Sequence, residues 1–148
     1  MQPRFFAGER VEAEWAVAFL PLVLASGGNS GSQSATLVIR ALTLEMLSRA
    51  DCIRLLGREL LMATMLGLAL MLEAFLLAML LEHPSKAMVV AMTVFMLVWM
   101  GSMAGTLLPL AFKKLGMDPA MMSNPLIAAL VDITGGVIYY SVARFIIP

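Results

Sequence analysis

Residues 60–81 read LLMATMLGLALMLEAFLLAMLL, and this stretch decides the fold class. It contains one charged residue, Glu73, and no proline. A helix rises 1.5 Å per residue, so about 20 such residues cross the roughly 30 Å hydrocarbon core of a bilayer. The whole chain is 61% hydrophobic and 14% charged, whereas soluble domains carry about 25% charged residues. The sequence therefore predicts an all-α integral membrane protein.

Three more segments have the length and hydrophobicity of membrane spans, at residues 15–39, 87–112 and 125–147. Together with residues 60–81 they predict four transmembrane helices in one domain, residues 15–148. A charged segment, residues 1–14, precedes them, and it is too polar for the apolar core of a signal peptide. Pro109 predicts a break or a tilt in the third helix.

Basic residues predict the orientation. The connection between the first two segments carries four arginines, and Lys113 and Lys114 lie between the last two segments, whereas the remaining loop carries Lys86 alone. Because lysine and arginine accumulate in cytoplasmic loops, we expect both chain ends on the outer side of the cell membrane.

Charge and residue counts exclude several classes. Ten basic and ten acidic side chains give no net charge and no basic patch for nucleic acid. One cysteine, Cys52, and one histidine, His83, provide neither a disulfide framework nor a zinc cluster. The predicted spans contain no paired aspartates and no Ser/His pair, so we do not expect an enzyme.

The most polar stretch of the chain, ASGGNSGSQSAT at residues 25–36, lies inside the first predicted span. Polar groups at membrane depth must pack against protein or face water. One interpretation is close helix packing, since the first and third segments each contain a GxxxG spacing (Gly27, Gly31, Gly101 and Gly105).

Amides in the same stretch support a second interpretation. Asn29 and Gln33 are four residues apart and share a helical face, with Gly28 and Ser32 close by. Their side chains can bond across a helix interface or line a hydrated passage.

Asp132 is the acidic residue of the last predicted span. A carboxylate within the membrane costs about 2.5–3.5 kcal/mol even on insertion scales, so it must face a bundle interior, a water-filled cavity or a cation. A buried ion pair or a protonated acid would also satisfy it. Mg²⁺ prefers oxygen ligands, retains several waters and needs one or two carboxylates. Two copies of the chain around a twofold axis would supply two carboxylates, and we treat this symmetric pairing as a hypothesis.

Methionine provides a competing signal, because Met88, Met92, Met96 and Met100 recur every four residues. Thioethers bind Cu(I), so a copper transporter is the alternative function. Methionine also fills irregular apolar packing, and a four-residue spacing rotates gradually around a helix rather than keeping one face. A structural membrane subunit that conducts no ion is a further alternative.

Two long runs resemble a known family. Residues 21–42, PLVLASGGNSGSQSATLVIRAL, and residues 108–140, which contain KKLGMDPAMMSNPLIAALVDITGG, are similar to the signature helices of MgtE-type magnesium channels. The resemblance covers nearly the whole chain from about residue 15.

The resemblance implies a homodimeric magnesium channel whose pore domain has five helices per subunit. The four segments here match the second to fifth of these helices, and the second and fifth line the ion path. It implies that Asp132 holds a largely hydrated Mg²⁺ with the carbonyl of Ala128. Gly28, Asn29, Ser32 and Gln33 then belong to the path, and Asp118 and Asn124 to its cytoplasmic mouth.

The family's first transmembrane helix and its cytoplasmic CBS-type regulatory domain have no counterpart in this sequence. The absent helix would account for an amino terminus on the outer side. The resemblance assigns no role to Glu73, which we expect to neutralise a basic group such as Arg144 or to occupy a side cavity.

Overall fold

The computed structural model is an all-helical bundle, as the sequence predicts. It describes the backbone of residues 5–44, 49–121 and 124–147, and the side chains from residue 14 onward within these ranges except those of residues 49 and 50. The elements in chain order are α1 (Phe5–Thr43), α2 (Arg49–Leu81), α3 (Pro84–Lys114), the short 3₁₀ helix η1 (Pro119–Met121) and α4 (Asn124–Ile146).

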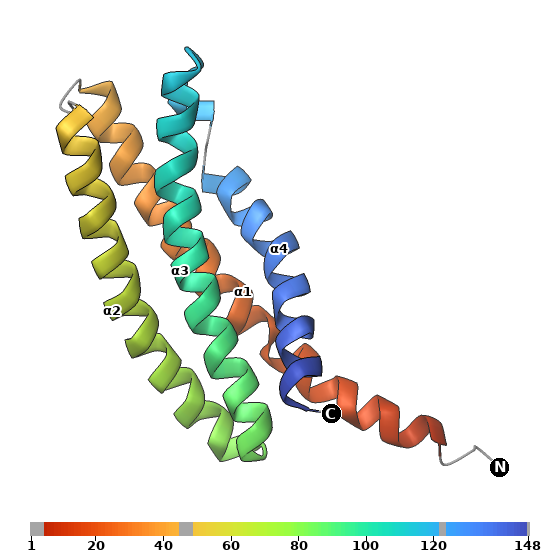
Figure 1. The fold of residues 1–148 in the computed structure, drawn as a ribbon. Helices are drawn as coiled ribbons and strands as arrows, with labels where there is room; N and C mark the ends of the chain where they lie inside the picture. Colours follow the sequence, from red (N-terminus) through yellow and green to blue (C-terminus); the bar gives the residue numbers. More distant parts are fainter. Residues whose placement is uncertain (1–4, 45–48, 122–123, 148) are drawn as a thin grey trace.

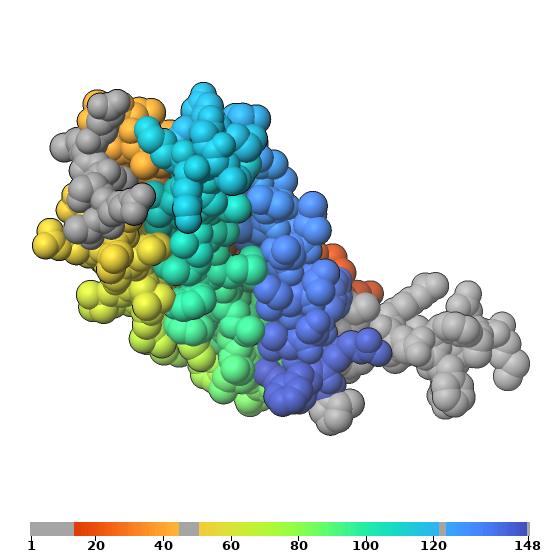
Figure 2. All heavy atoms as spheres, turned by 45° about the horizontal axis from the view of Figure 1, so that its top comes forward, coloured from red at the N-terminus to blue at the C-terminus, as the bar shows by residue number. Residues whose placement is uncertain are grey.

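Helix α3 is the central element of the bundle. It packs against α1, α2 and α4, whereas α2 hardly meets α1 and makes no described contact with α4 (Figure 1). Figure 1 shows α2 and α3 side by side and α1 crossing them obliquely, with its amino-terminal end beyond the bundle. In the space-filling view of Figure 2, α2, α3 and α4 form one continuous surface. This arrangement leaves one face of α2 and one face of α4 uncovered in a single chain.

Glycines bring the backbones of α1 and α3 into direct contact. A Cβ atom added to Gly101 would collide with the carbonyl oxygen of Gly27, and one added to Gly105 with that of Gly31. The contact is reciprocal, since a Cβ on Gly31 would lie 2.8 Å from the oxygen of Gly101. The two GxxxG spacings therefore mark one interface, and they confirm the packing interpretation for these four residues.

Helix α2 packs against α3 through a stripe of small residues. Ala63, Gly67, Ala74 and Ala78 are buried, while the leucines and methionines of its other faces are exposed. Lipid tails are as apolar as leucine, so close approach of small residues rather than apolar burial holds such helices together. The exposed face of α2 is suited to contact with lipid.

An outer cluster joins α1, α3 and α4 at the end opposite η1. Trp15 and Tyr139 are buried with ring centroids 6.1 Å apart in an edge-to-face arrangement. Lys86 lies 5.5 Å above the Trp15 ring and forms a 3.1 Å ion pair with Glu82. These contacts attach the α2–α3 hairpin to the first helix.

The helices are longer than the sequence predicts. Helix α1 begins at Phe5 and ends at Thr43 rather than covering residues 15–39, and α2 begins at Arg49 rather than at residue 60. The charged residues at the ends of α1 and α2 led us to predict loops there. Charged residues are nevertheless compatible with a helix, so both helices continue through them. The break predicted at Pro109 is wrong, because α3 runs through that residue, whereas the alternative of a tilt stays a prediction.

Within the described residues, three helices have the length and composition of membrane spans: Asp51–Leu81 within α2, Pro84–Lys114 and Asn124–Ile146. Helix α1 has 39 residues and is long enough to cross, but it is not among these three. The structure thus confirms three apolar helices, and a fourth span stays a prediction.

Hydroxyl groups inside the helices bond to their own backbone. Among the described side chains, seven donate to the carbonyl four residues earlier at 2.7–2.9 Å (Ser26, Thr36, Thr64, Thr93, Thr106, Thr134 and Ser141). A hydroxyl satisfied in this way can face hydrocarbon without an unpaired donor.

We predict that Gly105→Ala destabilises the bundle by about 1–3 kcal/mol, because the added methyl group forces the backbones of α1 and α3 apart. The midpoint of thermal unfolding in detergent measures the loss. Gly57→Ala is the matched control, since a Cβ at Gly57 meets nothing within 4 Å. Equal midpoints for the two variants would contradict the interface.

Candidate functional site

A polar groove lies between the cytoplasmic half of α1, in the predicted orientation, and the start of α4. It encloses about 480 Å³ and is lined by Asn29, Ser32, Gln33, Thr36, Leu37 and Asn124. Three of the predicted path residues and one predicted mouth residue therefore line one groove. Its other walls are open in a single chain, since Asn29, Gln33 and Asn124 are exposed.

Asn124 joins α4 to α1 at this groove. The Thr36 hydroxyl shares its single proton between the Asn124 side-chain oxygen at 3.0 Å and the Ser32 carbonyl at 2.8 Å, while Ser32 donates to the Asn124 carbonyl at 3.3 Å. Both hydroxyls belong to the polar stretch. The stretch therefore does more than allow close packing, because its hydroxyls fix the start of α4.

Asp132 lies on the uncovered face of α4. The residues that pack inward recur along the other face (Ile127, Val131, Gly135 and Tyr139). Asp132 is exposed, and the ion pairs among the described side chains are Arg54–Asp51 and Lys86–Glu82. No described basic group therefore neutralises Asp132 within one chain. The side chain is free to meet water, an ion or another copy.

Gly28 and Ala128 mark where α1 and α4 cross. Gly28 is buried, and a Cβ there would lie 3.8 Å from Ala128, an ordinary van der Waals distance. Within one chain, α4 therefore covers the face of α1 that carries Gly28. Ala128 is half-buried and lies one turn before Asp132, so the carbonyl of one and the carboxylate of the other belong to the same stretch of helix.

Asp118 has a local structural role in the turn between α3 and α4. Gly116 adopts φ 75°, the left-handed conformation that ends α3. The Asp118 carboxylate then accepts a 2.9 Å hydrogen bond from the Ala120 amide and so starts η1. One of its oxygens is used locally, and the exposed carboxylate keeps further acceptor positions.

The carboxylate of Asp132 and the carbonyl of Ala128 are the two predicted ion ligands on this stretch of α4. Among the described residues, no three His, Cys, Asp or Glu side chains lie together as a metal cluster. A single carboxylate and a backbone carbonyl suit an ion that keeps most of its hydration shell.

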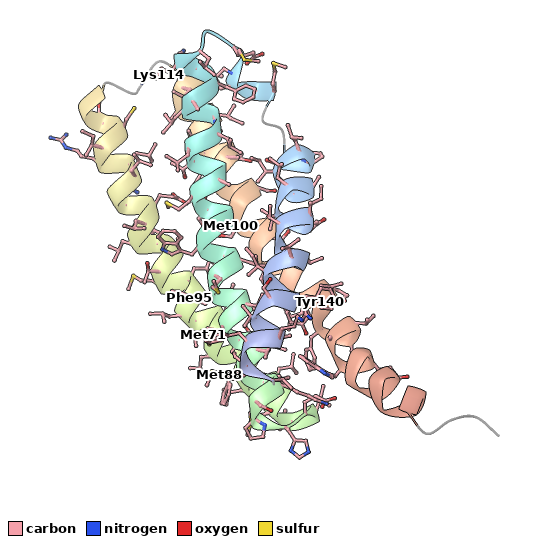
Figure 3. All side chains as sticks on the ribbon, turned by 45° about the vertical axis from the view of Figure 1, so that its right-hand side comes forward. Met71, Met88, Phe95, Met100, Lys114 and Tyr140 are labelled. Atoms are coloured by element: carbon pink, nitrogen blue, oxygen red, sulfur yellow. The ribbon has the colours of Figure 1, made fainter. Side chains whose placement is uncertain are left out.

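The methionine stripe does not form a ligand set in this structure. Met88, Met92 and Met96 lie on the outer surface of α3 and are 39–43% exposed, whereas Met100 is half-buried. In Figure 3, Met88 lies near one end of α3 and Met100 near its middle. Met88 borders a small apolar groove of about 240 Å³ with Met71, Leu72 and Phe75, which is consistent with a surface that contacts lipid.

Glu73 does not pair with Arg144 within the described chain. Both side chains are exposed, and α2 and α4 make no contact. The expectation that Glu73 neutralises Arg144 is therefore wrong for a single chain. Glu73 also lines neither the groove of about 480 Å³ nor the cavity of about 560 Å³.

Sequence reasoning missed a second polar group on α1. Ser30 bonds to Ser102 of α3 at 2.6 Å, and Ser34 donates to the Glu59 carboxylate of α2. The four-residue spacing of Ser30 and Ser34 signals a shared face, but the sequence pattern places Glu59 in the connection before the second span. Only the early start of α2 brings its carboxylate to this face.

These features define an α-helical integral membrane protein with amide, hydroxyl and carboxylate groups along helices of spanning length. A family model described as "MgtE: Divalent cation transporter" matches residues 20–142. The chain therefore belongs to the MgtE family, which is a family of transporters and not an enzyme class.

Three curated relatives support this assignment. The magnesium transporter MgtE of Thermus thermophilus is 42% identical over 93% of this chain, and that of Bacillus subtilis is 33% identical over 84%. The magnesium transporter MgtE of Enterococcus faecalis is 29% identical over 89%. The chain spans 31%, 28% and 29% of the lengths of these relatives.

We predict that Thr36 and Asn124 are energetically coupled. In a double-mutant cycle of Thr36→Val and Asn124→Ala, the coupling free energy of unfolding should be about 0.6 kcal/mol, the usual value for hydrogen bonds between membrane helices. Reversible unfolding in mixed micelles measures it. Thr64→Val is the control partner, because its hydroxyl bonds within α2, and its effect should add to that of Asn124→Ala. A coupling free energy of zero between Thr36 and Asn124 would show that their hydrogen bond does not join α1 to α4.

Proposed function

We propose that this chain forms the ion path of a magnesium transporter in the cell membrane, and that Asp132 binds the ion. The observation that carries the proposal is the position of Asp132. It is exposed on a helix of spanning length, and no described basic group pairs with it. Membership of a divalent cation transporter family and the names of the relatives support magnesium as the substrate.

The ion crosses in a largely hydrated form. One carboxylate per chain cannot replace the tightly held waters of Mg²⁺, whereas it can accept hydrogen bonds from them. The carbonyl of Ala128, one turn away, adds a further acceptor. Mg²⁺ is here the transported substrate, and the waters are its main ligands.

Two copies of the chain complete the path. The uncovered face of α4, which carries Asp132, and the open side of the groove need a second wall, and a twofold axis supplies one from the same residues. Two carboxylates then balance one divalent charge. Asn29, Ser32 and Gln33 line the path with Gly28 at the helix crossing, while Asn124 and Asp118 lie at the cytoplasmic mouth, roughly 12 Å or more from Asp132 along the axis.

We predict that Asp132→Asn lowers Mg²⁺ uptake into proteoliposomes at least about tenfold, since losing about 1.4 kcal/mol of ion stabilisation already has that effect. A magnesium-sensitive dye inside the vesicles reports the rate. Glu73→Gln, a matched change on the exposed face of α2, should leave uptake unchanged. Equal rates for Asp132→Asn and the unsubstituted chain would contradict the assignment, and no uptake by the unsubstituted chain would show that these residues do not suffice as a path.

We predict that the proposed dimer places two copies of residue 132 near each other. With Cys52→Ser as background, Asp132→Cys should be cross-linked between chains by a short bis-maleimide. Leu80→Cys should not, because Leu80 is 82% exposed on the lipid-facing side of α2. Denaturing gels measure the cross-linked fraction. Cross-linking at Leu80 but not at residue 132 would place the interface on α2 instead.

A further inference from the structure

A second polar cavity lies on the neighbouring face of α1, between α1, α2 and α3. It encloses about 560 Å³, and its polar lining consists of Ser30, Gln33, Ser34, Arg58, Glu59 and Ser102. Gln33 and Leu37 also line the groove beside α4, so these two residues border both hollows. Neither Asp132 nor Asn124 contributes to the second cavity.

The hydroxyl groups of this cavity are deeply buried. Ser30, Ser34 and Ser102 are 6%, 4% and 2% exposed, which is unusual for serine between membrane helices unless each finds a partner. Ser30 and Ser102 bond to each other at 2.6 Å, and Ser34 donates to Glu59. The cavity wall thus presents a row of oxygen atoms from three different helices.

Glu59 is under-satisfied for an ionised carboxylate. Its two oxygens offer about four acceptor positions, and the described chain fills one of them, through Ser34. Neither described ion pair includes Glu59. Arg58 precedes it and also borders the cavity, but a helix turns about 100° between neighbours, and the Arg58 side chain is exposed to solvent.

The size and chemistry of the cavity suit a hydrated cation. A water molecule occupies about 30 Å³ of liquid, so the cavity has room for an ion with part of its shell. An anion surrounded by low-dielectric wall is stabilised by a cation far more strongly than in water. Hydroxyl, amide and carboxylate oxygens are the ligands that hard divalent cations prefer, directly or through retained waters.

We propose that Glu59 binds a hydrated hard divalent cation in this cavity, with the hydroxyls of Ser34 and Ser30 as hydrogen-bond partners of its waters. This is a second cation site, separate from the one proposed at Asp132 and independent of it. The ion would lie beside the Ser34–Glu59 hydrogen bond that ties α1 to α2.

Mn²⁺ serves as the probe, because its unpaired electrons broaden the signal of a nearby nitroxide. The label is attached at Gly57→Cys in the full chain with Cys52→Ser, since position 57 is open and two residues from Glu59. In lipid nanodiscs we expect Mn²⁺ to broaden this signal and Mg²⁺ to reverse the broadening. No broadening at any Mn²⁺ concentration up to the millimolar range would overturn the proposal, because an ion bound at Glu59 would lie close enough to the label to broaden its signal.

Substitutions assign the ion to its ligand. Glu59→Gln keeps an acceptor for Ser34 but removes the charge, and it should raise the apparent Kd at least about tenfold, the equivalent of about 1.4 kcal/mol. Glu73→Gln, the same change on the same helix, should leave the Kd unchanged, and so should Asp132→Asn. An unchanged Kd in Glu59→Gln, or loss of broadening in Asp132→Asn, would overturn the second site. The latter result would leave the Asp132 proposal standing.

Arg58→Gln provides a test in the opposite direction. Removing a fixed positive charge from the cavity wall should tighten Mn²⁺ binding, by a factor that decreases as salt is raised. Arg58 is exposed, so this substitution should leave the fold intact. Weaker or equal binding in Arg58→Gln would contradict a cation at Glu59.

Discussion

The bundle depends on one contact, in which the backbones of α1 and α3 touch at Gly27, Gly31, Gly101 and Gly105. In a membrane, apolar burial does not drive helices together, so stabilisation must come from close packing and from polar groups that find partners. Glycine permits both at once, because it lets the helices approach until serines on either side meet. The 2.6 Å bond between Ser30 and Ser102 is a direct result of that approach.

The same contact explains how α1 tolerates its polar stretch. One face of residues 25–36 is covered by α3, a second is hydrogen-bonded to Asn124 at the start of α4, and a third reaches Glu59 of α2. The amides of Asn29 and Gln33 stay exposed beside the open groove. The two hollows beside it, of about 480 and 560 Å³, are the spaces that remain where side chains do not fill the gap between diverging helices.

Much of the fold followed from local patterns. Long uncharged runs predicted α2, α3 and α4, the GxxxG spacings predicted an interface, and the four-residue spacing of Asn29 and Gln33 predicted a polar face. The ends of α1 and α2 could not be predicted, because arginine and glutamate are good helix formers that also occur in loops. The error mattered most at Glu59, because a loop at this position would keep its carboxylate away from the cavity. The proposed pairing of Glu73 with Arg144 failed because side chains on α2 and α4 are separated by α3.

By itself, the amino-acid sequence determined that the chain is a helical membrane protein, that Asp132 is the acidic residue of the last apolar segment, and that one helix carries an unusual polar face. Hydrophobic run length and helical periodicity are local properties, so a sequence states them directly. Only the tertiary structure decided which groups share a cavity and which acid is left uncovered. Those outcomes depend on crossing positions of helices that are far apart in the chain, and glycine backbones and small side chains set these crossings through three-dimensional fit.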